Sequence, residues 1–128
     1  MKERVIYEGN GVRVSLRRLI NNSELIIDVR ESDEELRRKC YELLMKYYDD
    51  VLKHVKGKCK KKDLRFLEYT VAKAPLRSYH VVHQEVGSLH IGIGDVCIWF
   101  RLPHHIIEGM LRDGIVKVVK EWAERAKT

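Results

Sequence analysis

Histidines and lysines in the last third of the chain are the residues whose spacing suggests chemistry. His104 and His105 follow Pro103, where a helix is expected to begin and unpaired backbone N–H groups favour anions. Lys120 and Lys127 stand seven residues apart, two helical turns, so they share one helix face if the helix continues that far. Together these residues suggest a site for an anionic ligand. The alternative is that one histidine caps the turn, the other is solvated, and the lysine spacing is incidental among 25 basic residues.

Metal-binding patterns are weak in this chain. His80 and His83 lie three residues apart in an expected strand, where side chains alternate between faces, so they point in opposite directions. The three cysteines, at positions 40, 59 and 97, are widely spaced and form no Cys-x-x-Cys pair. We therefore expect reduced cysteines, no disulfide framework, no metal site and no cofactor.

A basic stretch from Lys56 to Lys62 holds five lysines in seven residues, in a chain whose net charge is +6. Such a stretch is suited to the phosphates of nucleic acid. It is also typical of a solvated helix end, where lysines complement the negative end of the helix dipole. Because no aromatic residue interleaves the run to stack on bases, nucleic acid is the less favoured interpretation.

The length and composition indicate a single domain covering residues 1–128. With 128 residues and 45% hydrophobic content, the chain can bury one core but not two. No apolar run reaches the roughly 18 residues of a membrane span and no signal peptide is evident, so we expect a cytoplasmic protein without a membrane partner. The 34% of charged residues is typical of thermophilic proteins with surface ion-pair networks.

The first half of the chain predicts a three-stranded antiparallel meander followed by a helix. Turn residues at Gly9-Asn10-Gly11 and at Asn21-Asn22 separate the strands. Ser32 and Glu35 form a capping-box pattern, with Ser32 as the N-cap. Apolar residues then recur at steps of three and four as far as Val55. The expected strands are 4–7, 12–20 and 25–29.

The second half predicts further strands and a long C-terminal helix. Strands are expected at 64–71, 79–86 and 96–101, and Pro103 is suited to the first turn of a helix. Apolar residues from Ile106 to Trp122 lie on one stripe of that helix, in which Gly109 and Gly114 favour close packing against a neighbour. The expected fold class is therefore α+β, a mostly antiparallel sheet flanked by two long amphipathic helices.

The expected C-terminal helix separates two of the candidate site residues. His104 and Lys120 are sixteen residues apart, roughly 24 Å along a straight helix at 1.5 Å per residue. Within one chain they cannot converge, so a shared site requires two chains. We therefore expect a homodimer.

The segment from Val86 to Lys120 resembles the large, catalytic subunit of molybdopterin synthase. The resemblance is carried by Gly87, Leu89 and Gly92, an apolar strand at 96–100, the His104-His105 pair and a helix leading to Lys120. It implies an α/β hammerhead-like fold, a homodimer and an enzyme that transfers two sulfur atoms to cyclic pyranopterin monophosphate. The sulfur would come from the thiocarboxylated Gly-Gly terminus of a small ubiquitin-like partner subunit.

The resemblance also implies roles for individual residues. Lys120 and Lys127 would be catalytic, and His104 would help to bind the phosphate of the pterin. The implied substrate-binding set also includes His105, Arg112 and Lys117. Positive charge from neighbours such as Arg112, Lys117 and Lys127 would lower the pKa of Lys120 and so activate it.

Departures from the family's pattern keep a second hypothesis open. Gln84 and His105 stand where the family has arginines, and guanidinium clamps phosphate better than imidazole does. Residues 63–79 are longer than the corresponding connection and predict an inserted hairpin. The alternative is a non-enzymatic basic α+β binding module for nucleic acid or a protein partner, since a fold can persist without its chemistry.

Overall fold

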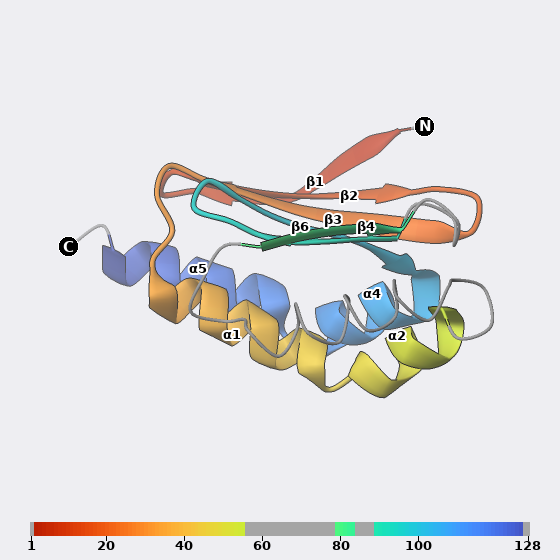
Figure 1. Ribbon diagram of the computed structural model, residues 1–128. Coiled ribbons are helices and arrows are strands. Elements are labelled where there is room, and N and C mark those ends of the chain that lie inside the picture. Colours follow the sequence, from red (N-terminus) through yellow and green to blue (C-terminus); the bar gives the residue numbers. More distant parts are fainter. Residues whose placement is uncertain (1, 56–78, 84–88, 127–128) are drawn as a thin grey trace.

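The structure is a computed structural model, and it describes residues 2–55, 79–83 and 89–126. In these ranges six strands form one antiparallel sheet, and four helices form a second layer against one of its faces (Figure 1). The α+β class expected from the sequence is confirmed. The strands are β1 Glu3–Gly9, β2 Val12–Arg18, β3 Asn22–Val29, β4 Tyr79–His83, β5 Leu89–Ile93 and β6 Cys97–Pro103. The helices are α1 Glu34–Met45, α2 Tyr48–Val55, α4 His104–Arg112 and α5 Ile115–Ala126.

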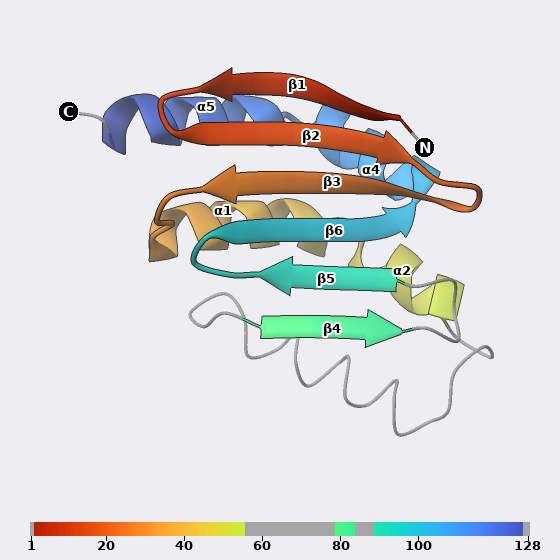
Figure 2. The same ribbon diagram turned by 90° about the horizontal axis from the view of Figure 1, so that it is seen from above.

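The sheet has the strand order β1-β2-β3-β6-β5-β4 (Figure 2). The first three strands form the expected meander. Asn10 and Gly11 make the two-residue turn between β1 and β2, with φ of +53° and +79°. A type I′ turn requires positive φ at both positions, and Asn-Gly adopts it most easily. Since β6 then pairs with β3, residues far apart in the sequence lie on neighbouring strands.

Alternation along the strands places every second side chain against the helices, on what we call the covered face. Burying one such aliphatic or aromatic side chain contributes roughly 1.5–3 kcal/mol, so this layer holds the helices to the sheet. The buried residues of the covered face are Val12, Val14, Leu25, Ile27, Val29, Leu89, Ile91, Ile93, Ile98, Phe100 and Leu102.

The strand β5 is absent from the sequence prediction. Glycines at positions 87, 92 and 94 are typical of turns, yet Leu89, Ile91 and Ile93 alternate with His90 and Gly92 along an extended backbone. The three aliphatic residues are buried on the covered face, and their burial outweighs the low strand propensity of glycine. The expected strand 64–71 lies outside the described residues, and that at 79–86 is described only as far as residue 83.

Each of the two expected long helices is divided in two. A turn at Lys46 and Tyr47 separates α1 from α2, and a turn at Asp113 and Gly114 separates α4 from α5. Gly114 has φ of +94°, which is incompatible with an α-helix, so this glycine ends α4 instead of packing within a longer helix. Gly109 does serve close packing, because a Cβ there would overlap the hydroxyl of Tyr47.

The start of α1 also differs from the prediction. Asp33 is the N-cap, and its Oδ1 accepts the backbone N–H of Leu36 at 2.9 Å and the indole N–H of Trp122 at 3.0 Å. Ser32 instead donates its hydroxyl to the carbonyl of Gly94 at 2.9 Å. The capping-box prediction is therefore wrong by one residue, because Ser32 is used to join the loop before α1 to the turn after β5.

The helical layer runs along the length of the sheet. In it α4 contacts β3 and β6, while α5 contacts α1, β1 and β2. The two helices follow one another beneath the sheet (Figure 1). Among the described helices, none has the length and apolar character needed to cross a bilayer.

Candidate functional site

His104 opens α4, as the sequence predicts, but both nitrogens of its ring are engaged within the chain. The carbonyl oxygen of Ile20 lies 3.2 Å from Nε2, and since a carbonyl only accepts, Nε2 carries the proton of the neutral ring. The hydroxyl of Ser23 lies 2.7 Å from Nδ1 and donates to it in that tautomer. An anion would have to displace one of these contacts to bind the ring.

The other predicted site residues on α4 and α5 are exposed. His105 and Arg112 lie on the outer surface of α4, and Lys117 and Lys120 on that of α5. Lys117 is 3.9 Å from the carboxylate of Glu121, a surface pair of the kind that contributes a few tenths of a kcal/mol. These four side chains are solvated within the described chain and are not enclosed together.

The turn at Gly114 changes the spacing argument for His104 and Lys120, because the helix that carries them is not straight. The two residues still belong to different parts of the helical layer, since α4 lies against β3 and β6 and α5 against β1 and β2. Lys127, Gln84, the Lys56 to Lys62 stretch and residues 63–78 lie outside the described residues.

The histidines and the cysteine that could be considered as metal ligands lie in the second half of the sheet. His80 and His83 fall in β4, at register positions across from Gly92 and Leu89 of β5. Among the side chains that the structure describes, in 2–54 and 89–126, no group of three or more His, Cys, Asp or Glu could hold a metal ion. The free thiol of Cys97 is half-buried, and burial together with nearby Asp28 raises its pKa to about 11, so it stays protonated at neutral pH.

A pocket of about 670 Å³ lies beside Ser23, the residue that holds His104. Its apolar wall comes from β2 and α4. Three basic and two acidic side chains also line it, which suits a small ligand with an apolar body and an anionic group. The lining residues are Lys2, Glu3, Arg4, Leu16, Arg18, Ser23, Ile107, Glu108 and Leu111.

The second face of the sheet carries no described helix, and we call it the open face (Figure 2). The strand register arranges its side chains in three rows that cross the strands. The charged row consists of Glu3, Arg17, Glu24, Arg101 and His90. The middle row consists of Val5, Ser15, Ile26, Trp99 and Gly92. The outer row consists of Glu8, Arg13, Asp28 and Cys97.

Glu24 lies at the centre of the charged row and is fully buried, although no helix covers it. One of its carboxylate oxygens accepts from Arg17, from Nε at 2.8 Å and from Nη2. The other accepts from Trp99 Nε1 at 2.8 Å and from Arg101 Nη2 at 3.2 Å. Four donors therefore saturate this carboxylate, which has no capacity left for a ligand.

The network keeps Glu24 ionised. Burial by itself raises the pKa of the carboxyl group, but the hydrogen bonds and positive charges of Arg17 and Arg101 outweigh burial and lower it below its ordinary 4.5. Two guanidinium groups around one carboxylate leave one net positive charge. The Nε of Arg101 is buried and makes no hydrogen bond to any described part of the chain.

Trp99 is fixed in one orientation by its neighbours. Its indole N–H is bonded to Glu24, and its ring stacks on His90 with centroids 3.7 Å apart and planes inclined by 27°. The guanidinium carbon of Arg101 lies 5.4 Å from the ring centroid, within cation–π range. Gly92 stands across from Trp99 in the register and leaves room for the ring over β5. The open face thus presents a partly exposed aromatic ring that is held rigidly.

A pocket of about 210 Å³ opens on this face beside the network. Ser15, which is only 2% exposed, contributes a hydroxyl to it. The pocket is rich in hydrogen-bond donors, because both arginines of the charged row also line it. The lining residues are Glu3, Ser15, Leu16, Arg17, Glu24, Ile26, Trp99 and Arg101.

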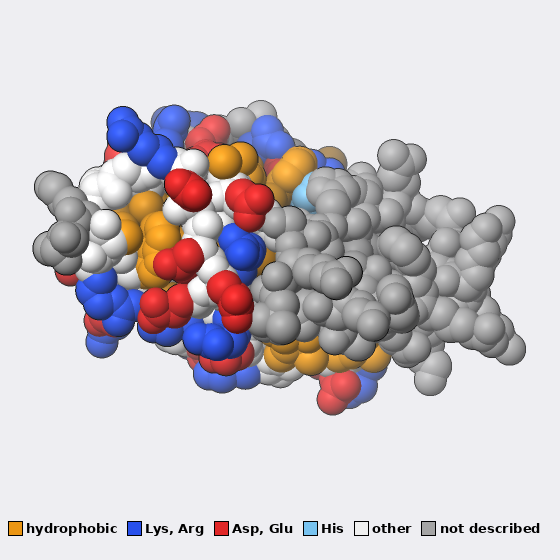
Figure 3. All heavy atoms as spheres, turned by 60° about the vertical axis from the view of Figure 1, so that its left-hand side comes forward, with side chains coloured by type: hydrophobic (Ala, Val, Ile, Leu, Met, Phe, Trp, Pro, Cys, Tyr) orange, Lys and Arg blue, Asp and Glu red, His pale blue; other side chains and the backbone are white. Residues whose placement is uncertain are grey.

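The described part of the chain is electrically neutral. Segment 56–78 holds eight lysines and arginines and two acidic residues, which by itself equals the net charge of +6. The described ranges hold sixteen basic and sixteen acidic residues, and side chains of both signs are interspersed on the face shown in Figure 3. The three rows of the open face contain three arginines and four acidic residues. This face is therefore not the basic surface that nucleic acid requires.

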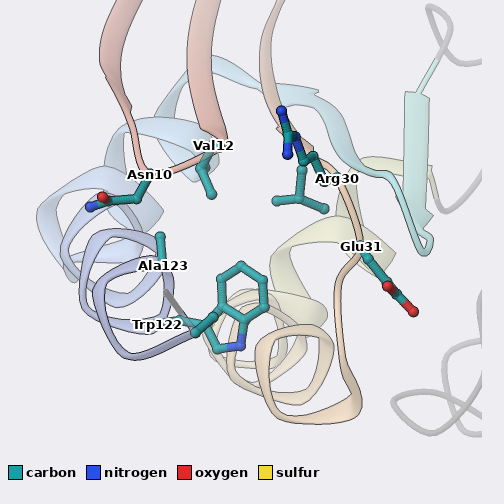
Figure 4. A pocket seen from close by; sticks show the side chains of 9 residues that line it. Asn10, Val12, Arg30, Glu31, Trp122 and Ala123 are labelled. Atoms are coloured by element: carbon teal, nitrogen blue, oxygen red, sulfur yellow. The ribbon is translucent and has the colours of Figure 1, made fainter. Parts of the chain in front are cut away.

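A recess of about 450 Å³ lies where the β1–β2 turn and the loop before α1 meet the end of α5 (Figure 4). Trp122 and Val12 face this recess, while the carboxylate of Glu31 points away from it. The indole N–H of Trp122 is already bonded to Asp33. The recess is thus mainly an apolar gap between turn and helix, and a weaker candidate for a site than the open face.

Sequence reasoning missed the network on the open face. Arg17, Glu24 and Arg101 are ordinary members of alternating strands, and they meet only because β3 pairs with β2 on one side and with β6 on the other. The available signal is a single charged residue next to a run of aliphatic ones, as at Glu24 before Leu25-Ile26-Ile27. That signal identifies no partner, because pairing and register are set between strands.

Comparison with protein-family models, with curated proteins and with solved structures finds no match. The resemblance to molybdopterin synthase therefore stays a prediction. The two features on which a function can be built are the open face and the pocket beside His104.

Proposed function

We propose that the protein is an interaction module that binds a protein partner on the open face of its sheet. The observation that carries this proposal is the middle row, where Val5 is 40% exposed and Ile26 and Trp99 are partly exposed. A solvated sheet face ordinarily carries polar side chains. Burying the carboxylate of Glu24 costs free energy, and its hydrogen bonds hold Trp99 in place. A face that contacts only water does not require such an arrangement.

The side chains of the open face favour a protein surface as the partner. Tryptophan and arginine are enriched at the centres of protein interfaces, and they dominate the energetics of many. Trp99 and Arg101 are already held by Glu24, so they lose little conformational freedom when a partner binds. The rows cross five strands, a width of roughly 19 Å at about 4.8 Å per strand, which is enough for a compact contact.

Nucleic acid has less support as the partner of this face. Four acidic residues stand among its three arginines, whereas single-stranded nucleic acid requires a positively charged groove. The Lys56 to Lys62 stretch keeps nucleic acid open as a prediction for a part of the chain outside the described residues. Titration of RNA and DNA at several salt concentrations tests it, since phosphate contacts produce a steep loss of affinity with salt.

The interaction surface is tested by photo-crosslinking in the producing cells. A photoreactive phenylalanine analogue replaces Val5 on the open face in one variant and exposed Glu42 on α1 in a matched control. We expect a discrete crosslinked adduct from position 5 and no adduct of the same mass from position 42. Equal adducts from both positions, or none from either, would contradict it.

A second candidate function is the sulfur transfer of a molybdopterin synthase catalytic subunit. The observation that favours it is the pocket beside Ser23 and His104, whose rim includes Lys2, Arg4 and Arg18 as potential phosphate ligands. In this proposal Lys120 and Lys127 act on the pterin. His104 of one protomer and Lys120 of the other form one site in a homodimer, because the two residues do not converge within one chain.

The second candidate is tested by mixing the protein with a thiocarboxylated small subunit and the cyclic pterin precursor. Dithiolene product that disappears in Lys120→Ala, but not in the matched surface control Lys46→Ala, supports it. Absence of product while a known large subunit works in parallel removes it. Sedimentation that shows a monomer at micromolar concentration removes the shared two-chain site.

A further inference from the structure

We infer that the 210 Å³ pocket beside Arg17 and Arg101 is a carboxylate-binding subsite, which receives an acidic side chain of the partner on the open face. That the carboxylate belongs to a protein partner rests on the proposed function. That the pocket binds a free carboxylate does not rest on it, so the two statements are tested separately.

The donors of the pocket are fixed but only partly used. Glu24 takes Nε and Nη2 of Arg17 and one Nη2 group of Arg101. Each guanidinium has five N–H donors, so several remain for a ligand. The buried Nε of Arg101 makes no hydrogen bond to the described chain, and the hydroxyl of Ser15 lines the same pocket. Glu24 is saturated, so it acts as the positioning residue that holds both arginines toward the ligand.

The charge of the pocket suits a single negative charge. Arg17 and Arg101 exceed Glu24 by one positive charge, and Glu3 at the pocket is half exposed and 3.8 Å from Arg13 of the outer row. A carboxylate brings one negative charge and two coplanar oxygens, which match the fork of a guanidinium group. A phosphate dianion would bring a second negative charge close to Glu24 and Glu3, for which no further cation lines the pocket.

The size of the pocket limits what the carboxylate is attached to. A pocket of about 210 Å³ lies below the roughly 300 Å³ at which sites for drug-sized ligands begin. It accommodates a carboxylate with a short aliphatic stem but not a nucleotide. Ile26 and Trp99 form the apolar part of its wall, against which the methylene groups of an aspartate or glutamate side chain can pack.

The subsite is tested by nuclear magnetic resonance with acetate and N-acetylglutamate as probes. The chain has two tryptophans, and Trp99 donates its indole N–H to Glu24 at the pocket, while Trp122 lies at the far recess. We expect a saturable shift of the Trp99 indole signal and none of the Trp122 signal. Sodium chloride at equal ionic strength is the control. A shift that does not saturate, or that chloride reproduces, overturns the inference.

Two substitutions locate the binding. Arg101→Gln should weaken acetate binding by about tenfold or more, since a charge-assisted hydrogen bond is lost. Arg38→Gln removes an exposed arginine of α1, which is not among the residues that line the pocket, and should leave the affinity unchanged. Arg101→Lys keeps the charge without the fork and gives an intermediate loss, which keeps the test valid if Arg101→Gln does not fold. Equal losses in Arg38→Gln and Arg101→Gln overturn the assignment.

Inorganic phosphate is the second arm of the titration. Phosphate that shifts the Trp99 signal with the affinity of acetate overturns the choice of carboxylate. If no carboxylate binds but position 5 gives a discrete adduct, the subsite is overturned and the proposed interaction surface is still supported. Carboxylate binding without any adduct supports the subsite and removes the proposed protein partner.

Discussion

On the covered face of β3, Leu25 and Ile27 are buried by helices, whereas on the open face Glu24 is buried by the side chains of its own neighbours. Burial on the covered face requires only apolar side chains of suitable volume. Burial of Glu24 requires particular hydrogen-bond donors at particular register positions, because a buried charge without partners is strongly unfavourable. The covered face therefore tolerates substitution by similar residues, while the open face depends on the identity of each residue in its network.

Phe100→Ala on β6 should have the largest effect on stability. Phe100 is fully buried on the covered face, and removing its ring leaves a cavity that the helices cannot close. We expect a loss of about 3–5 kcal/mol in the free energy of unfolding, measured by urea denaturation. A loss under about 1 kcal/mol would mean that the helices do not pack on the sheet as described.

Glu24→Gln should have the largest effect on the open face. The substitution keeps the shape of the side chain but leaves Arg17 and Arg101 without their counter-charge, at a cost of about 3 kcal/mol. The matched control is Glu8→Gln, an exposed acid of the outer row, which should change stability by less than about 0.5 kcal/mol. Similar effects of the two substitutions in urea denaturation would show that the network is not buried.

The stability of the wild-type protein should fall with acid more steeply than that of Glu24→Gln. Burial raises the pKa of Glu24, but Arg17 and Arg101 outweigh burial and lower it below 4.5, so the unfolded chain takes up the proton first. The contribution of Glu24 is therefore complete above the unfolded pKa and is lost as pH falls through the folded one. Unfolding free energies of both proteins from neutral pH downward measure this difference. Parallel curves would show that Glu24 is not selectively stabilised in its charged form.

Arg13→Gln should have the smallest effect. The side chain of Arg13 is 51% exposed and lies 3.8 Å from Glu3, and exposed pairs of this kind contribute little. We expect a change within about 0.5 kcal/mol by thermal denaturation. A larger loss would place the outer row in the same cooperative network as the charged row.

Much of the fold could be predicted from the periodicity of apolar residues, because the side chains of the covered face are apolar residues at regular spacing. The meander follows from strand-like runs between turn residues, α1 from apolar residues at steps of three and four, and the start of α4 at His104 from Pro103 before it. The strand β5 escaped prediction because glycine at position 92 hid its alternation. The break at Gly114 escaped because a glycine that ends a helix and one that packs inside it look alike in sequence.

The candidate site on the open face could not be predicted in the same way. His104 and the lysines of α5 attract notice as residue types. Glu24 and Trp99 gain their significance from a contact between two residues that are 75 positions apart. Register between β3 and β6 is a property of the folded sheet. No spacing within either strand reveals it.

The pairing of β3 with β6 also has a consequence for the order of folding. β1, β2 and β3 are joined by short turns, whereas roughly 70 residues separate β3 from β6, and closing so long a loop is slow. Arg17 can meet Glu24 within the early meander, but Trp99 and Arg101 reach it only when β6 docks. Until then β3 is a free edge strand that carries the acidic side chain of Glu24 near its start. A charge on a free edge discourages pairing with other chains, so we expect Glu24 to reduce aggregation of the partly folded chain as well as to organise the folded one.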